Sequence, residues 1–350
     1  MTARDAVADL RAIAFALERA GEAAYRVRAF RKAADAVGAL PADEVARRAA
    51  DGTLTKVPGI GEVTARCVAE SLAGEEPVYL RRLLATADTP LDEATSALVA
   101  ALRGDCHTHS DWSDGGAPIG EMVAAAIALG REYLVVTDHS PRLTVARGLS
   151  ADRLAEQLDL IAALNATVPP GFRILTGIEV DINADGTLDQ TDELLGRLDV
   201  VVASLHSRLR DPSELLTPRM LAAVANPHVD ILGHCTGRIV RADSARAGGR
   251  TRPPSEFDAP AVFAACAEHG VAVEVNARPD RLDPPKRLLR LAEEAGCLFA
   301  VDSDAHAPGQ LDWLRGGCER AARCGVRADR IVNTWPVAEL LAWTAGHGTR

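Results

Sequence analysis

From residue 103 onward, short apolar runs alternate with amphipathic segments of helical length. The runs cover residues 103–107, 133–137, 173–178, 199–204, 229–233, 271–276 and 297–302. Helical patterns separate most of them, over residues 119–129, 152–165, 260–269 and 284–295. Strands that alternate with helices in this way predict an α/β architecture with a parallel sheet. We predict that this sheet is closed, with one strand fewer than the common eightfold barrel.

Almost every run ends in a residue type that binds metal ions. His107 and His109 close the first run, and alternation along a strand turns both side chains to one face. In a parallel barrel, the carboxyl ends of all strands point to one rim, where active sites lie. The side chains that would meet there are His107, His109, Asp114, His139, Glu179, His206, His234, Asp304 and His306.

Each of these residues taken alone is more often structural than functional. Six of the nine histidines of the chain nevertheless fall on this single pattern, which a structural explanation does not account for. We therefore predict a metal centre at the rim. The remaining histidines, His228, His269 and His347, lie outside the pattern, and we expect them to be structural or on the surface.

The size and chemistry of this residue set indicate the reaction. The set contains more His, Asp and Glu side chains than the roughly three protein ligands that a catalytic zinc ion uses. We therefore expect two or three divalent ions with a bridging carboxylate. Imidazole and carboxylate ligands suit manganese, zinc or iron better than magnesium or calcium. Clustered cations hold a phosphate and lower the pKa of a bound water. We predict metal-assisted phosphoester hydrolysis, with the water held by Glu179 and Asp304.

The first 85 residues follow a helical pattern instead. Amphipathic segments over residues 3–20 and 40–50 flank a helix with a basic cluster, formed by Arg26, Arg28, Arg31 and Lys32. A Val-Pro-Gly-Ile-Gly turn then enters a helix, and its Gly59 and Gly61 expose backbone N–H groups that can hold a phosphate. We interpret it as a helix-hairpin-helix motif that binds DNA backbone without reading bases. A solvated helix face and a tight interhelical turn are the alternatives.

Residues 25–34 and 57–65 carry a family resemblance: the first eighty or so residues resemble the small amino-terminal domain of family X DNA polymerases. The resemblance implies DNA binding at gaps. In some members, a lysine on the helix after the hairpin forms a Schiff base in a lyase reaction. Cys67 occupies that position here, and since this chemistry requires an amine, we expect no lyase activity. No segment between this region and His107 is a candidate for a polymerase palm.

A second resemblance covers residues 104 to about 340. The motifs that carry it are Gly104–His109, Thr137–Ser140, Ala146–Leu149, Gly233–Arg238, Glu274–Asn276, Arg278–Leu282 and Asp304–His306. They resemble the polymerase and histidinol phosphatase (PHP) domain family, in the version attached to bacterial family X polymerases. The resemblance implies a distorted sevenfold β/α barrel (PHP fold), in agreement with the strand count. Cys235 departs from the family, which usually carries proline there, and we expect it to be structural.

The resemblance also implies a division of the ligands among three ions. One ion would bind His107, His109, Glu179 and Asp304. A second would share Glu179 and add His206 and His234. A third would bind Asp114, His139 and His306. Just past two strand ends, Arg238 and Arg278 would contact the substrate phosphate as guanidinium forks, or form salt bridges at the rim.

Net charge and cysteine content indicate the binding partners and the cellular compartment of the protein. The net charge of −10 argues against non-specific DNA binding by the whole surface. The charge is uneven, because residues 1–85 hold 13 basic and 12 acidic side chains and the remainder holds 26 and 37. The seven cysteines are scattered without a Cys-x-x-Cys pair, which fits reduced thiols in the cytoplasm. We find no apolar run of membrane-spanning length.

These observations predict three parts: a helix-hairpin-helix DNA-binding domain over 1–85, a helical linker over 86–103, and a PHP phosphoesterase domain over 104–343. The leading hypothesis is a manganese- or zinc-dependent phosphoesterase that acts on DNA, as a 3′–5′ exonuclease or in 3′-end or abasic-site processing during repair. The alternative is a small-molecule phosphatase of the histidinol-phosphatase type, which the acidic barrel favours. A DNA-binding module with a purely structural barrel is a third hypothesis, and the complete ligand set argues against it.

Overall fold

The computed structural model describes residues 3–85, 90–240 and 251–347 of the chain. The chain divides into two compact units, Met1–Pro90 and Leu91–Arg350, which we call the N-terminal unit and the barrel unit. Helix α6 (Glu93–Ala101) lies in the stretch that we expected to be a linker. It belongs to the barrel unit and packs against α13 (Leu314–Arg323).

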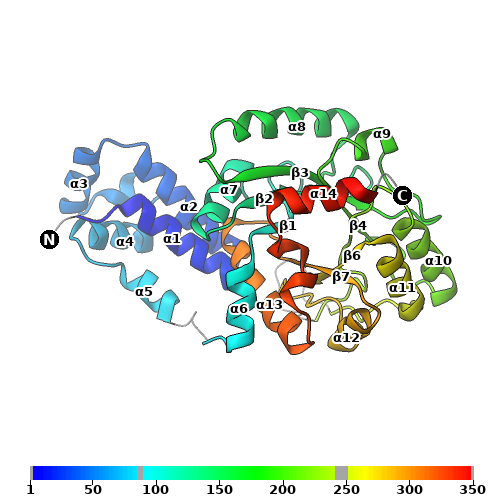
Figure 1. Ribbon diagram of the computed structural model, residues 1–350. Helices are drawn as coiled ribbons and strands as arrows, with labels where there is room; N and C mark the ends of the chain where they lie inside the picture. Colours follow the sequence, from blue (N-terminus) through cyan, green and yellow to red (C-terminus); the bar gives the residue numbers. More distant parts are fainter. Residues whose placement is uncertain (1–2, 86–89, 241–250, 348–350) are drawn as a thin grey trace. The chain divides into compact units, whose positions relative to one another are not determined.

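The barrel unit is built on a seven-stranded parallel sheet whose strands follow the order of the chain. The strands are β1 (Gly104–Thr108), β2 (Tyr133–Val136), β3 (Arg173–Asp181), β4 (Val200–Ser204), β5 (Ile231–Leu232), β6 (Ala272–Asn276) and β7 (Leu298–Asp302). A bridge between Thr108 and Ala305 brings the first strand against the end of the last. The fold is therefore a nearly closed sevenfold β/α barrel, as predicted, with helices around the sheet (Figure 1).

Strand residues of the barrel alternate between two apolar cores. On β4, Val200 and Val202 belong to one buried cluster, whereas Val201 and Ala203 belong to another that also includes helix residues. Side chains of neighbouring strand residues point to opposite faces, so both faces of the sheet are covered. This burial on both faces explains the runs of Val, Ile and Leu, which are typical of parallel sheets.

The helices of the barrel unit include several that the sequence patterns predict and some that they do not. The predicted ones are α6, α7 (Ile119–Ala128), α8 (Ala151–Asn165), α11 (Ala259–His269) and α12 (Lys286–Glu294). The others are α9 (Asp192–Leu195), α10 (Ser213–Val224), α13 and α14 (Val337–His347). Helix α10 contains Pro218, which obscures its pattern because proline disfavours helix interiors. His347 ends α14, and its Nδ1 lies 2.7 Å from Asp230, so this histidine is structural.

The N-terminal unit is all-helical, as predicted. Its helices are α1 (Ala6–Arg19), α2 (Ala24–Gly38), α3 (Ala42–Ala50), α4 (Glu62–Leu72) and α5 (Val78–Ala85). Gly59 adopts a φ of 98° in the turn before α4, a conformation that favours glycine. Gly61 is the N-cap residue of α4, and its N–H donates to Oγ1 of Thr64 at 3.0 Å. Across both units, no helix of the described residues has the length and apolarity needed to cross a membrane.

Candidate metal centre

Glu179, at the end of β3, lies at the centre of the predicted ligand set. Its side chain is buried, and its carboxylate oxygens lie close to ring nitrogens of five histidines. The distances are 3.3 Å to His107, 3.5 Å to His109, 2.8 Å to His139, 3.2 Å to His206 and 2.8 Å to His234. The parallel topology thus brings histidines from four strand ends to the carboxylate on a fifth strand.

A second cluster surrounds Asp114 in the loop after β1. Its Oδ1 lies 3.1 Å from Nε2 of His306 and 3.6 Å from Nε2 of His139. The rings of His109 and His306 stack with their centroids 4.1 Å apart. Ligand atoms of all four residues lie within 4.8 Å of one another.

Two further groups of this kind share Glu179, one with His107 and His109 and one with His139 and His206. The structure therefore contains three overlapping groups of potential ligands. His109 and His139 belong to two groups each, so the grouping differs in detail from the expected ligand sets, in which only Glu179 is shared. Asp304 and His234 border the same groups through their contacts with His109 and Glu179.

The donor atoms fit divalent ions. Both ring nitrogens of His109, and Nε2 of His107 and of His206, are buried and form no well-aligned hydrogen bond with the described residues, although the Nε2 atoms face carboxylate oxygens at 3.2 to 3.5 Å. A buried polar atom without a partner is costly, and a bound cation would satisfy it. Imidazole nitrogen with carboxylate oxygen is a donor set suited to zinc, manganese or iron.

The protonation states of His109 and Glu179 fit metal binding. At His107 and His206, burial opposes ionisation but the neighbouring carboxylates outweigh it and raise the pKa, so a metal ion would displace a proton from these two rings. Burial, together with the neighbouring His306 and His139, lowers the pKa of His109 to about 3, so its imidazole is neutral at physiological pH. Burial opposes ionisation of Glu179, but the surrounding histidines outweigh it and hold its pKa well below the usual range. Neutral imidazoles and ionised carboxylates are the forms that bind metals.

Buried carboxylates behind the histidines hold some of these rings in place. Glu274 on β6 accepts a hydrogen bond from Nδ1 of His107 at 2.6 Å and another from the backbone N–H of His234. Asp181, two residues beyond Glu179, pairs with Nδ1 of His206. A carboxylate on one ring nitrogen directs the other nitrogen toward a metal.

Asp138 organises the loop that carries Asp114. Its buried carboxylate accepts hydrogen bonds from the N–H and hydroxyl groups of Ser110 and Ser113, and from Gln157 at 2.7 Å. We did not predict site roles for Glu274, Asp181 or Asp138. A signal was present for two of them, because Asp181 stands two residues from Glu179 and shares its strand face, and Glu274 lies in one of the motifs that carry the family resemblance.

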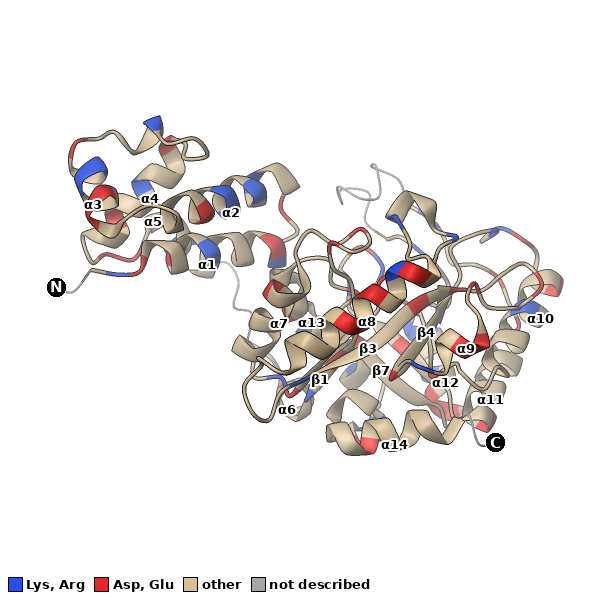
Figure 2. Ribbon diagram, turned by 90° about the horizontal axis from the view of Figure 1, so that it is seen from above, with Lys and Arg blue, Asp and Glu red and all other residues tan. Residues whose placement is uncertain are grey.

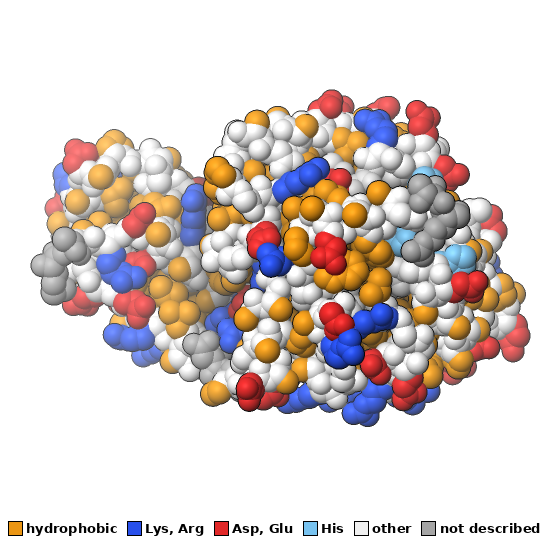
Figure 3. Space-filling model, viewed as in Figure 1, with side chains coloured by type: hydrophobic (Ala, Val, Ile, Leu, Met, Phe, Trp, Pro, Cys, Tyr) orange, Lys and Arg blue, Asp and Glu red, His pale blue; other side chains and the backbone are white. Residues whose placement is uncertain are grey.

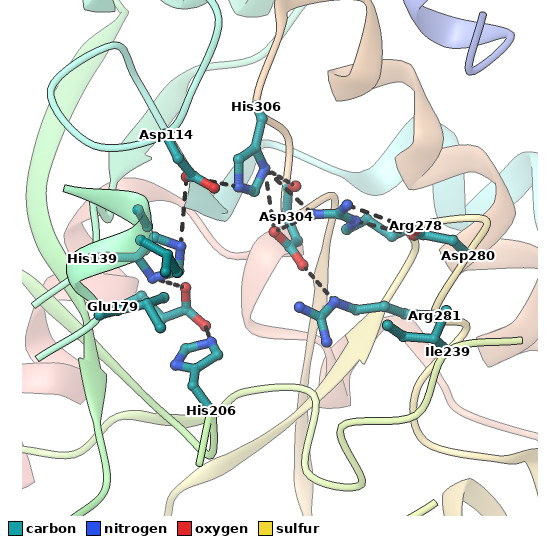
Figure 4. A pocket seen from close by; sticks show the side chains of 13 residues that line it. Asp114, His139, Glu179, His206, Ile239, Arg278, Asp280, Arg281, Asp304 and His306 are labelled. Carbon is teal, nitrogen blue, oxygen red and sulfur yellow. Dashed lines mark hydrogen bonds and ion pairs between the residues drawn. The ribbon is translucent and has the colours of Figure 1, made fainter. Parts of the chain in front are cut away.

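Figure 4 shows that two kinds of wall enclose the pocket beside these ligands. Its volume is about 200 Å³. Asp114, His139, Glu179 and His206 line one wall, while Arg278, Asp280, Arg281 and Ile239 line the other. A phosphate between the walls would face metal ligands on one side and guanidinium groups on the other.

Asp304 links the two walls. Its carboxylate lies 3.5 Å from Nε2 of His109, and 3.2 Å from both Arg278 and Arg281. Burial opposes ionisation of Asp304, but Arg278 in particular overcomes it and holds its pKa well below the usual range. The backbone of Asp304 has a φ of 51°, a left-handed conformation that is uncommon outside glycine and often occurs at functional sites.

The arginines that we singled out have different surroundings. Arg278 is buried in the arginine wall, where it also contacts Asp280 at 3.2 Å. Arg238 is not among the residues that line this pocket, since its guanidinium donates to the backbone carbonyls of Arg281 and Leu282. Its position holds the loop that presents Arg281, a pocket residue that we did not predict.

The predicted DNA contacts of the N-terminal unit also divide into two groups. Arg26 contacts Glu22 at 2.6 Å and Tyr79 at 2.9 Å, and Arg31 contacts the buried Glu18 at 2.7 Å. Arg28 and Lys32 are exposed on α2, whose basic residues appear in blue in Figure 2. A Cβ added to Gly59 would lie 3.0 Å from Cγ of Lys32, so the hairpin turn and the basic helix are adjacent.

Known proteins match both units. Residues 105–278 match the PHP domain model and residues 1–76 a helix-hairpin-helix domain model. The DNA polymerase/3′-5′ exonuclease PolX of Bacillus subtilis (strain 168) is 36% identical over 267 residues, which cover 76% of this chain and 45% of that protein. A probable phosphatase of Thermoanaerobacter sp. (strain X514) is 28% identical over 246 residues, which cover 66% of this chain and 89% of that protein.

Solved structures also align with part of the chain. One of them is the histidinol phosphate phosphatase of Lactococcus lactis subsp. lactis Il1403, in complex with zinc, L-histidinol and phosphate. The alignment has a TM-score of 0.46 at 20% identity, and covers 64% of this chain and 94% of that one. The chain spans less than half the length of the B. subtilis relative.

Proposed function

We propose that this chain, a member of the PHP family with a helix-hairpin-helix domain before its barrel, is a metal-dependent phosphoesterase that acts on DNA. The reaction is hydrolysis at a 3′ end, either as 3′–5′ exonuclease activity or as processing of blocked 3′ ends and abasic sites. The observation that carries the proposal is the presence, in one chain, of a buried histidine–carboxylate centre faced by arginines and a domain of a DNA-binding type.

The proposed division of ions follows the ligand groups. His107, His109, Glu179 and Asp304 would hold one ion, Glu179 with His206 and His234 a second, and Asp114, His139 and His306 a third. Bound divalent ions supply Lewis acidity toward phosphate oxygens and lower the pKa of water. The donor set favours manganese or zinc, with iron as a further option.

The residues of the chain would hold the phosphate and the reactants. Arg278 and Arg281 would bind the non-bridging phosphate oxygens from the wall opposite the ligands, while ionised Glu179 and Asp304 orient the attacking water. In the reaction, the water oxygen bonds to phosphorus, the bond from phosphorus to the sugar O3′ breaks, and that oxygen takes up a proton. The products are a nucleoside monophosphate and a strand that is shorter by one nucleotide.

The deciding experiment compares two substrates with one control variant. The metal-loaded chain is assayed on gapped DNA labelled at the 5′ end of the strand to be degraded, and on histidinol phosphate, beside Asp304→Ala. Products of stepwise 3′ shortening that disappear in the variant support the proposal. Phosphate release from histidinol phosphate alone would overturn it.

Small-molecule phosphatase activity is the second candidate. It is supported by the probable phosphatase of Thermoanaerobacter, because the alignment covers 89% of that protein. The acidic composition of residues 86–350, with 26 basic and 37 acidic side chains, also favours a small substrate over a polyanion. The same experiment separates the two candidates.

A further inference from the structure

We propose that Arg281, Arg252 and Arg210 form an arginine rim beside the pocket that binds backbone phosphates of a DNA strand beyond the phosphate being hydrolysed. This inference rests on the proposed function and deepens it, because it names how the barrel unit itself engages the strand. It concerns the barrel unit alone and is separate from any contact made by the helix-hairpin-helix domain.

Arg281 is the innermost member of the rim. It lines the pocket, and its Nε lies 3.2 Å from Oδ2 of Asp304. Figure 4 shows its guanidinium on the wall opposite Glu179 and His139. The loop that carries it is fixed by Arg238, which donates to the backbone carbonyls of Arg281 and Leu282. The innermost position is therefore held in place before a substrate arrives.

Arg252 adjoins the same wall through its backbone. Its N–H donates to the carbonyl of Ile239 at 2.9 Å, and its carbonyl accepts from the N–H of Ile239 at 2.8 Å. Ile239 lines the pocket. The Nε of Arg252 donates to the carbonyl of Gly237 at 2.5 Å. The Val240 N–H donates to the carbonyl of Asp280 at 2.7 Å, which ties this segment to the loop of Arg281.

Arg210 extends the rim outward from a second loop. It is exposed, and the preceding residue, Leu209, packs over Gly237: a Cβ at Gly237 would lie 2.9 Å from Cδ2 of Leu209. The carbonyl of Leu209 accepts a hydrogen bond from Ser255 at 2.9 Å, three residues after Arg252. The loops that carry Arg210 and Arg252 are thus joined by direct contacts.

Arg252, the middle member of the rim, is repelled by both of the others. Burial, with Arg281 and Arg210 nearby, lowers the pKa of Arg252. Of the residues that the structure describes, none forms an ion pair with Arg210 or Arg252. Repulsion among gathered positive charges is relieved when a polyanion covers them.

A DNA strand matches this layout better than a small phosphoester does. A single phosphate in the pocket is within reach of Arg278 and Arg281, and leaves Arg252 and Arg210 without an anion. A DNA strand carries further phosphates outward from the pocket, and these phosphates would bind both Arg252 and Arg210. The rim therefore predicts that substrate affinity rises with strand length even when the chemistry at the 3′ end is unchanged.

The test measures binding of a single-stranded 20-mer to the metal-loaded full chain by fluorescence anisotropy at several salt concentrations. The 3′-terminal linkages of the oligonucleotide are phosphorothioates, which slow hydrolysis and keep the charge. Arg210→Gln and Arg252→Gln should each weaken binding about fivefold and lower the log–log salt slope by roughly 0.7. All proteins carry Gly59→Val and Gly61→Val, so that the contribution of the hairpin is constant.

Arg173→Gln is the matched control, since Arg173 is 51% exposed at the start of β3, at the opposite end of the barrel from the pocket. It should leave the slope unchanged. The control variant should also hydrolyse a chromogenic phosphodiester at the rate of the parent protein. Since Arg210 is exposed, Arg210→Gln should keep the unfolding temperature of the parent protein. It therefore tests the rim even if Arg252→Gln fails to fold.

The outcomes separate the two proposals. If Arg210→Gln and Arg252→Gln leave the salt slope at the level of Arg173→Gln, the rim is overturned, whether or not the chain cleaves DNA. If the chain binds the strand through the rim but does not shorten unmodified DNA, the proposed function fails and the rim stands. Loss of slope in all three variants would also refute the rim, because it would assign binding to general surface charge.

Discussion

The charged residues of interest lie in contrasting settings in the two units. In the barrel unit they are mostly buried and face one another around Glu179 and Asp304. In the N-terminal unit they lie on helix surfaces, and Arg26 and Arg31 pair with acidic neighbours of the same unit. On the face shown in Figure 3, basic and acidic side chains of the barrel unit are also interspersed.

This difference shows which charged residues need a ligand or partner for the fold to be stable, and which do not. Burial of so many ionisable groups is unfavourable unless each group is paired or bound to a ligand. The cluster in the barrel is therefore best explained by a bound ligand. Exposed arginines carry no such cost, and an ion pair on a helix surface contributes little to stability. The predictions below test whether function and stability divide between the units in this way.

Replacement of the central carboxylate should have the largest effect. Glu179→Gln removes the negative charge that faces five histidines while keeping the shape of the side chain. We expect hydrolysis to fall by roughly 10³-fold and the bound metal, measured by plasma mass spectrometry, to decrease by at least one ion per chain. Removal of metal from the wild-type chain with a chelator should reproduce the loss of activity. A fully active variant with unchanged metal content would contradict the assignment of this centre.

Carboxylates behind the ligands should have intermediate effects. Glu274→Gln weakens the hold on Nδ1 of His107, and Asp181→Asn does the same for His206. Since such partners orient the ring and raise its basicity, we expect metal affinity to fall by about 10- to 100-fold. Competition with a chromogenic chelator measures this directly. Asp199→Asn, at the start of β4 away from the ligands, is the control and should keep wild-type affinity.

Much of this centre follows from the strand topology alone, which is why most of its ligands could be predicted from the sequence. Residues at the ends of successive parallel strands must meet at one rim, so the positions of His107, Glu179 and Asp304 relative to one another needed no knowledge of contacts. The residues behind them are harder to infer, because their roles depend on hydrogen bonds to residues distant in sequence. Glu274 on β6 bonds His107 on β1, and Asp138 bonds the loop after β1 and a residue of α8. Arg281 was missed for a related reason: its role depends on a loop conformation that Arg238 imposes.

In the N-terminal unit, the sequence did not predict which basic residues form ion pairs. Helical spacing places Arg26, Arg28, Arg31 and Lys32 on one helix, but does not reveal which of them meet a partner on another helix. Arg31 meets Glu18 of α1 and Arg26 meets Tyr79 of α5. The second of these helices was not predicted, so its contact with Arg26 was not foreseen. The DNA-binding roles of these residues remain predictions.

Substitution in the hairpin turn should affect DNA substrates only. Gly59→Val with Gly61→Val places a branched side chain at a φ of 98° and against Lys32, which would displace the backbone N–H groups. We expect about a tenfold loss of activity on DNA at moderate salt and none on a chromogenic phosphodiester. Gly21→Val is the matched control, because its φ is 69° and its Cβ meets nothing within 4 Å. Equal losses on both substrates would refute the division of labour between the units.

Two arginines of α2 should separate binding from stability. Arg28→Gln removes an exposed charge and should lower the salt slope of DNA binding by about 1 without changing the unfolding temperature. Arg31→Gln breaks the pair with Glu18, whose side chain is 4% exposed, and should cost about 1 kcal/mol of stability with little change in the slope. Anisotropy titrations and thermal melts of both variants measure the two quantities. Reversal of this pattern would mean that Arg31 leaves Glu18 to bind DNA.

The smallest effect should come from the ion pair at the start of α1, and it should depend on pH. Hydrogen bonds from Arg4 to the buried Asp9, at 2.7 and 3.0 Å, lower the pKa of that carboxyl. A lowered pKa in the folded state adds stability above the ordinary aspartate pKa of about 3.9, and this contribution disappears as the pH falls through the lowered value. Arg4→Gln should therefore lower the unfolding temperature at pH 7, and the difference from wild type should shrink below about pH 4. Arg11→Gln, whose guanidinium is 66% exposed and 4.0 Å from Asp35, should show no such trend. A difference that stays constant from pH 7 to pH 3 would show that Arg4 stabilises the unit by packing rather than through the charge of Asp9.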